Sequence, residues 1–175
     1  MPLAAPIGIK TRPTTDRAKE GLFNIISHRV RDARFLDLFC GSGQIGIEAL
    51  SRGAELAVFV DSCPNAVSAL LGNLAKTGFA SRSRYYLERA ETAILRLGHD
   101  GERFGVVFMD PPYGAGFVEE TLGMLAKSRL LVEEGLLVVE SFSKVVDNIP
   151  SSLYLIDARA YGTVHFLFFE QREAV

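Results

Sequence analysis

The motif "DPPY" at residues 110–113 has the residue types needed to methylate the amino group of a planar base. Such amino groups are poor nucleophiles because their lone pair is delocalised into the ring. Two acceptors, one for each N–H, would localise the lone pair: the Asp110 carboxylate and the main-chain carbonyl of Pro111. Pro111 and Pro112 remove competing backbone donors and stiffen the loop. The ring of Tyr113 would stack on a base drawn out of its helix. This chemistry depends on positioning and electrostatics and needs no metal.

A second motif, "DLFCGSGQIG" at residues 37–46, carries glycines in GxGxxG spacing at Gly41, Gly43 and Gly46. Asp61 lies at the end of the next apolar run, where dinucleotide-binding folds bind a ribose hydroxyl. A nicotinamide- or flavin-dependent oxidoreductase is therefore one interpretation of this loop.

Asp37 favours S-adenosylmethionine over a dinucleotide as the ligand of the glycine loop. Dinucleotide folds usually keep this position apolar because a pyrophosphate lies close by. S-adenosylmethionine has no phosphate but carries a sulfonium and an ammonium group, and a carboxylate attracts cations and repels anions. A P-loop is excluded because no Gly-Lys-Ser/Thr sequence follows. The two motifs together indicate an amino-methyltransferase and leave open which molecule carries the amino group.

Alternating strands and helices are expected to position these motifs. Apolar runs predict strands, and amphipathic segments between them predict helices, after a first helix that begins at Thr14 or Thr15. The last two strands have no helix between them. This pattern predicts an α/β, Rossmann-like fold with a mostly parallel seven-stranded sheet, helices on both faces and an antiparallel C-terminal hairpin. Ligands of such sheets bind beyond the carboxyl ends of the strands. The expected strands are residues 34–39, 56–61, 84–87, 104–110, 135–141, 152–157 and 164–170, and the expected helices after the first are 43–53, 64–78, 90–97 and 117–128.

Composition is consistent with one soluble domain over residues 1–175, with 48% hydrophobic and 23% charged residues. The net charge of −2 is uneven, because residues 1–34, a basic segment with its helix, carry seven Lys or Arg against three acidic residues. This excess of positive charge suits a polyanionic partner. Cys40 and Cys63 form no CxxC pair and the three histidines are scattered, so neither a disulfide framework nor a metal site is expected. The sequence shows no secretory signal or membrane span, which predicts a cytoplasmic protein.

Six segments of the chain carry a resemblance to a known family: "RPTTDRAKEGLFN" (12–24), "LDLFCGSGQIGIEALSRGA" (36–54), "FVD" (59–61), "FMDPPYG" (108–114), "LVVES" (137–141) and "YGTVHFLFF" (161–169). Together they resemble the bacterial 16S rRNA (guanine-N2) methyltransferase D family. The resemblance covers about residues 11–170, in the order of the family's motifs. At the N-terminus, "MPLAAPIGIK" stands where the family has a Gly- and Arg-rich segment of the form RIIGGxxxGRxL.

The resemblance implies a class I methyltransferase fold, S-adenosylmethionine as cofactor, and methylation of the N2 of one guanine in 16S rRNA. The implied partner is therefore 16S rRNA or the assembling small ribosomal subunit. The DPPY motif alone is shared with other amino-methyltransferases, so DNA adenine N6 and protein glutamine N5 stay alternative targets. The resemblance implies that Asp61 binds the cofactor's ribose hydroxyls, and that Arg89 and Ala90 lie near its adenine. The residues implied to line the cofactor are Asp37, Phe39, Gly41, Ser42 and Gly43; those implied to hold the base are Asp110, Pro111 and Tyr113; those implied to close over the pocket are Arg12, Thr14 and Thr15.

Overall fold

The computed structural model describes residues 2–5, 7, 14–112 and 116–173. Within these residues, no helix is both long and apolar enough to cross a membrane. The helices are α1 (Asp16–Val30), α2 (Gln44–Ser51), α3 (Pro64–Thr77), α4 (Ala90–His99) and α5 (Phe117–Ser128), with a 3-10 turn η1 at Ala80–Arg82. The strands are β1 (Arg34–Leu38), β2 (Leu56–Asp61), β3 (Ser83–Leu87), β4 (Phe104–Met109), β5 (Leu131–Ser141), β6 (Leu153–Tyr161) and β7 (Val164–Gln171).

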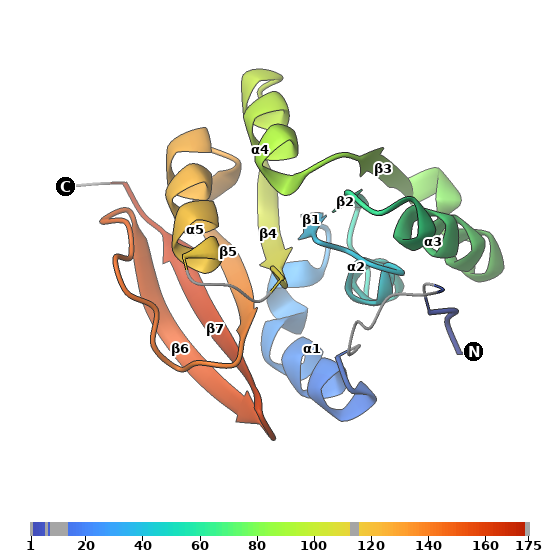
Figure 1. The fold of residues 1–175 in the computed structure, drawn as a ribbon, viewed down its shortest axis with the longest axis horizontal. Coiled ribbons are helices and arrows are strands. Elements are labelled where there is room, and N and C mark those ends of the chain that lie inside the picture. Colours follow the sequence, from blue (N-terminus) through green and yellow to red (C-terminus); the bar gives the residue numbers. More distant parts are fainter. Residues whose placement is uncertain (1, 6, 8–13, 113–115, 174–175) are drawn as a thin grey trace.

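The strands form a seven-stranded sheet in the order β3-β2-β1-β4-β5-β7-β6 (Figure 1). The strands β3, β2, β1, β4 and β5 run parallel, whereas β7 pairs antiparallel with both β5 and β6. The predicted fold class, including the C-terminal hairpin, is therefore confirmed. Because β1 lies between β2 and β4, the loops that follow these three strands come together at one edge of the sheet.

The helix starts follow from local sequence chemistry. The Thr15 hydroxyl caps α1 by accepting the N–H of Ala18, as the predicted start at Thr14 or Thr15 requires. Helix α3 starts with Pro64 at its first turn and ends at Gly78, whose φ of 74° lies in the left-handed region. These caps give the helices lengths close to those expected from the sequence.

Two strands extend four residues beyond the bounds expected from the sequence, β5 at its start and β6 at its end. β5 begins at Leu131, four residues before the predicted start at Gly135, and the register against β4 shifts between Phe104 and Val106. Leu131 is buried, but residues 132–134 are exposed and two of them are acidic, so they interrupt the apolar pattern before Gly135. β6 continues beyond its predicted end at residue 157 to Tyr161. This added segment is mostly exposed and stays extended because it pairs with β7. Hydrophobic patterning detects buried strand residues and misses such extensions.

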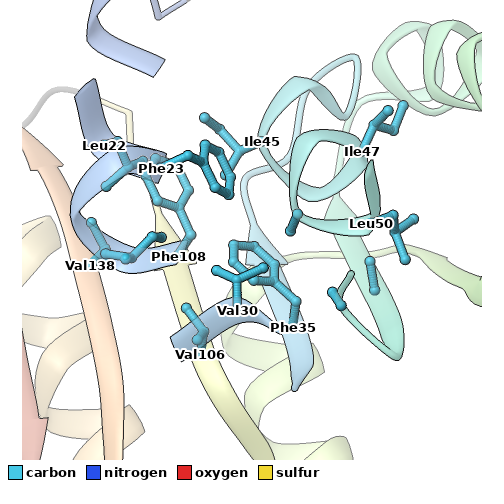
Figure 2. Close-up of a cluster of buried hydrophobic side chains, with 14 of the residues drawn as sticks. Leu22, Phe23, Val30, Phe35, Ile45, Ile47, Leu50, Val106, Phe108 and Val138 are labelled. Atoms are coloured by element: carbon cyan, nitrogen blue, oxygen red, sulfur yellow. The ribbon is translucent and has the colours of Figure 1, made fainter. Parts of the chain in front are cut away.

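Two apolar layers cover the two faces of the sheet. One layer joins α1, α2 and α3 to the sheet, and the other joins α4 and α5 to the opposite face. Figure 2 shows the first layer, in which Leu22 and Phe23 of α1 meet Phe108 of β4 and Val138 of β5. Side chains alternate along a strand, so Asp110 and Glu140, two residues beyond Phe108 and Val138, belong to this same face. The start of α1 therefore covers the face on which the carboxylates lie.

Candidate active site

Four carboxylates lie at the carboxyl ends of four consecutive strands of the sheet. Asp37 is the last residue but one of β1, Asp61 ends β2, and Asp110 directly follows β4. The sequence analysis expected these three on neighbouring strands, and the strand order β2-β1-β4-β5 brings them together. Glu140, near the end of β5, is a fourth carboxylate that the sequence analysis gave no role.

Backbone hydrogen bonds fix the glycine loop between β1 and α2. The N–H of Cys40 donates to the Val60 carbonyl at 2.9 Å, and the N–H of Gly43 donates to the Cys40 carbonyl at 2.8 Å. Phe39, Gly41 and Gly43 all have positive φ, at 60°, 54° and 84°. A Cβ on Gly41 would meet no atom within 4 Å, so open space lies in front of the backbone there. The loop therefore presents bare peptide groups to a ligand.

Gly46 has a packing role that differs from that of Gly41. A Cβ on Gly46 would lie 2.3 Å from the ring of Phe59, which places α2 directly against β2. Gly43 is similarly enclosed, because a Cβ there would lie 2.3 Å from the Leu70 side chain of α3. The last two glycines of the motif thus allow helices to approach the sheet, and only the first opens onto free space.

The Asp37 carboxylate is almost fully buried, with 1% of its surface exposed. Its Oδ2 accepts the N–H of Gly46 at 2.9 Å, in the first turn of α2. Burial raises the pKa of Asp37 to about 8, opposed by that hydrogen bond and reinforced by the charges of Asp61 and Glu140. A buried carboxyl with one donor and two acidic neighbours favours a cationic ligand beside it.

Asp61 bridges the glycine loop and the start of α3. Its Oδ2 accepts the N–H of Gly41 at 2.8 Å and its Oδ1 accepts the N–H of Cys63 at 2.9 Å. Each carboxylate oxygen has further acceptor capacity, so the group is held in place and can still accept hydroxyl donors.

A pocket of ≈300 Å³ opens beside Asp61. Four residues assigned to the cofactor from the sequence line it together: Phe39, Asp61, Arg89 and Ala90. Pro112 of the "DPPY" motif also lines it, so the pocket reaches the end of β4. The exposed Arg89 guanidinium forms an ion pair with Glu91 at 3.2 Å. The remaining residues that line the pocket are Val60, Ser62, Glu91 and Phe117.

Asp110 lies beside Glu140. Met109 and Val139 are paired in the β4–β5 register, so Asp110 and Glu140 are the next residues of the two strands. Burial, followed by the charges of Glu140 and Asp37, raises the pKa of Asp110 to about 8. Pro111 is buried, whereas Tyr113 lies outside the described residues and its stacking role stays a prediction.

The start of α1 reaches this pair of carboxylates. The Thr14 hydroxyl donates to Glu140 Oε2 at 2.7 Å, which joins the N-terminal side of the chain to the end of β5. Thr15 and Glu140 line one pocket of ≈380 Å³ that the turn between β6 and β7 completes. Arg12, which was expected to close over the site with these threonines, lies outside the described residues.

Asn73 and Glu140 are two site residues to which the sequence analysis gave no role. Asn73 of α3 is fully buried; its amide donates to the Ser42 carbonyl at 3.0 Å and to the Ala4 carbonyl at 3.1 Å. It thereby ties the glycine loop to the N-terminal segment. Two sequence signals could have pointed to these residues. One is an asparagine among the apolar positions of α3, and the other is a carboxylate near the end of the apolar run of β5.

A wider hollow lies away from these residues. It measures ≈920 Å³ and is lined by residues 27–28, 31–32 and 51–53, at the ends of α1 and α2. These positions precede β1 and β2, so the hollow is at the amino ends of the strands. Ligands of open α/β sheets bind at the opposite end.

Comparison with known proteins identifies the family. Residues 1–170 match the family model described as Conserved hypothetical protein 95. The chain is 36% identical over 173 residues to Ribosomal RNA small subunit methyltransferase D of Escherichia coli strain K12, a match that covers 98% of this chain and 85% of that protein. The chain belongs to the small-subunit rRNA methyltransferase D family. The resemblance stated from the sequence motifs is confirmed.

Solved structures similar to this member of the methyltransferase D family share its fold over nearly the whole chain. The yhhF protein of Escherichia coli matches with a TM-score of 0.86 at 33% identity, covering 98% of this chain and 92% of that one. A hypothetical protein of Thermus thermophilus matches with a TM-score of 0.78 at 34% identity, covering 96% of this chain and 92% of that one. The similarity thus includes the strands that carry the four carboxylates.

Proposed function

We propose that this protein transfers a methyl group from S-adenosylmethionine to the exocyclic N2 of a guanine in 16S rRNA. The observation that carries the proposal is the meeting of Asp37, Asp61 and Asp110 at one edge of the sheet, around the open glycine loop. Membership of the methyltransferase D family supports the rRNA as substrate.

The residues at the glycine loop fit S-adenosylmethionine. Open space in front of Gly41 leaves room for a ligand against the backbone. The buried Asp37 would attract the ammonium and sulfonium charges and would repel the pyrophosphate of a dinucleotide. Asp61, held by Gly41 and Cys63, would accept the two ribose hydroxyls. Phe39, Arg89 and Ala90 would enclose the adenine in the pocket beside Asp61.

The bound cofactor would supply an electrophilic methyl carbon on a positively charged sulfur. Asp110 would accept one N–H of the guanine amino group and the Pro111 carbonyl the other, which holds the nitrogen lone pair toward that carbon. Methyl transfer would form an N–C bond and break the S–C bond of the cofactor, and the nitrogen would then lose a proton that the neighbouring Asp110 carboxylate would accept. Because Asp110 must be ionised to do this, its raised pKa links activity to pH.

Transfer of labelled methyl groups to defined substrates tests the proposal. The substrates are unmodified 16S rRNA and 30S particles, with oligodeoxynucleotides and peptides alongside, followed by nucleoside and amino-acid analysis. We expect N2-methylguanosine in 16S rRNA, supplied free or in the particle, and no methylated product from the oligodeoxynucleotides or peptides. Methylation of adenine N6 in DNA or of glutamine N5 in peptides would contradict the proposed substrate and would leave the amino-methyltransferase chemistry in place.

Calorimetric titration tests the cofactor separately. We expect S-adenosylmethionine and S-adenosylhomocysteine to bind and NAD to give no heat of binding. Binding of NAD in preference to S-adenosylmethionine would support an oxidoreductase and contradict the proposal.

A further inference from the structure

We propose that Glu140 reads the N1–H of the target guanine and thereby makes the enzyme select guanine over purines that lack this donor. The inference rests on the proposed function, because it assigns a second contact to the same substrate base. It starts from the position of Glu140 beside Asp110 at the ends of β5 and β4.

Glu140 is a buried carboxylate that lines a cavity. Only 6% of its surface is exposed, and it forms part of the wall of the ≈380 Å³ pocket. In the strand order, β4 separates this pocket from the one beside Asp61 on β2. Asp110 at the end of β4 therefore lies between the proposed cofactor pocket and the Glu140 pocket. A base held by Asp110 would extend into the latter, whose volume suits a purine.

The two carboxylates match one edge of guanine. Neighbouring parallel strands lie about 4.8 Å apart, so groups at equivalent positions can contact adjacent atoms of one base. The Watson–Crick edge of guanine presents N1–H beside the N2 amino group, and bases drawn out of a helix are read along this edge. With Asp110 on the amino group, Glu140 is placed to accept N1–H. Adenine and 2-aminopurine have a bare N1 acceptor there, which a carboxylate repels.

Electrostatics support a donor-rich ligand at this point. Burial raises the pKa of Glu140, opposed by the Thr14 hydrogen bond, and the pKa of Asp110 is raised in the same direction. Within the described part of the chain, Thr14 is the hydrogen-bond donor to the Glu140 carboxylate. Two adjacent buried carboxylates become more stable as anions when N–H groups donate to them. The N1–H and N2–H groups of guanine are such donors.

Thr14 holds Glu140 from the α1 side. Its hydroxyl occupies Oε2 at 2.7 Å, which orients the carboxylate and directs the other oxygen as the acceptor for a base. Arg17 and Thr163 also line the pocket, so a cation and a hydroxyl are available at its wall. Glu140 acts as a specificity residue, and the amino group that reacts remains the partner of Asp110.

A base swap in the substrate tests this role. Nucleoside mapping first identifies the methylated guanine in a 16S rRNA fragment, and a ligated fragment then carries 2-aminopurine at that position. 2-Aminopurine keeps the 2-amino group and lacks N1–H. We expect the wild-type enzyme to prefer guanine by at least about 10-fold in kcat/KM, the discrimination that one base contact provides.

Glu140→Gln supplies the second half of the experiment. An amide can donate to the bare N1 of 2-aminopurine, so the variant should lose at least about 10-fold on guanine and reduce the guanine preference by a similar factor. Its affinity for S-adenosylmethionine should change far less than its guanine preference, because Glu140 does not line the pocket beside Asp61. Glu133→Gln, an exposed position on the same strand, is the matched control and should keep the wild-type preference.

Each failure has a distinct meaning. If the wild-type enzyme forms no N2-methylguanosine in rRNA, the proposed function fails. If it forms N2-methylguanosine but uses 2-aminopurine equally well, the role proposed for Glu140 is wrong. This comparison uses only the wild-type enzyme, so it does not depend on the folding of a variant. An unchanged guanine preference in Glu140→Gln would overturn the role as well.

Discussion

The Asp61 carboxylate and the backbone N–H of Gly41 are joined by a 2.8 Å hydrogen bond between residues twenty positions apart. This bond ties the end of β2 to the glycine loop after β1. The same side chain that would bind the ribose therefore also fixes the loop against which the cofactor would lie. Binding geometry and loop geometry depend on one residue.

Asp61→Ala should weaken cofactor binding and leave turnover at saturating cofactor nearly unchanged. Loss of hydrogen bonds to a charged group, about 1.5–3 kcal/mol, predicts a 10- to 100-fold higher KM for S-adenosylmethionine. Steady-state kinetics with varied cofactor measures both constants. Asp100→Ala, at the far end of α4, is the control. A large fall in kcat at saturation would contradict the assignment of Asp61 to binding.

Asp110→Asn should keep cofactor binding and lose most of the activity. An amide is a weaker acceptor and can turn its NH2 toward the substrate amine, which costs about 2–4 kcal/mol of transition-state stabilisation, or about 10²–10³ in rate. Calorimetry and single-turnover methyl transfer measure the two effects, with Asp100→Asn as control. Full activity of Asp110→Asn would show that the loop after β4 has another role.

The fold was predictable because its buried strands are short apolar runs separated by well-capped helices. The bounds of β2 and α5 agree with the sequence expectation at both ends. The extensions of β5 and β6 were missed because most of their side chains are exposed and their pairing comes from neighbouring strands. Local pattern carries no information about such pairing.

The site was predictable where chemistry follows a motif and unpredictable where it depends on side-chain contacts. The carboxylates Asp37, Asp61 and Asp110 could be placed because each lies at or near the end of an apolar run. The contact between Thr14 and Glu140 spans 126 positions in sequence, and that between Asn73 and Ser42 spans 31. Only the packing of α1 and α3 on the sheet brings these groups together.

The stability of the ligand-free protein should fall as pH rises from about 4 to about 8. The pKa of Asp37 is raised from 3.8 to about 8 in the folded protein, so in this range the folded state binds more protons than the unfolded state. Stability therefore decreases with rising pH, and Asp110 contributes in the same direction. Thermal unfolding between about pH 5 and pH 8 measures this dependence. Asp37→Asn keeps an acceptor for the Gly46 N–H and should flatten the curve.

S-adenosylmethionine should stabilise the protein more strongly as pH rises over the same range. Its positive charges favour ionised Asp37, so binding is coupled to loss of a proton. The shift in unfolding temperature at saturating ligand measures this coupling. Methylthioadenosine, which lacks both the ammonium and the sulfonium charge, is the matched control and should show no comparable trend. Equal trends for the two ligands would mean that Asp37 does not face the charged groups.

Two glycine-to-alanine substitutions in helices should have opposite effects on stability. In Gly46→Ala the new Cβ would lie 2.3 Å from the Phe59 ring, so α2 must move away from the sheet at a cost of about 1–3 kcal/mol. In Gly72→Ala, on the exposed side of α3, a Cβ meets no atom within 4 Å. Alanine there should stabilise the helix by about 0.5–1 kcal/mol. Urea unfolding of both variants measures the free energies of unfolding.

Because Gly46 also donates its N–H to Asp37, displacement of α2 should weaken cofactor binding in Gly46→Ala and leave it unchanged in Gly72→Ala. Equal stability of the two variants would contradict the packing role assigned to the last glycine of the motif.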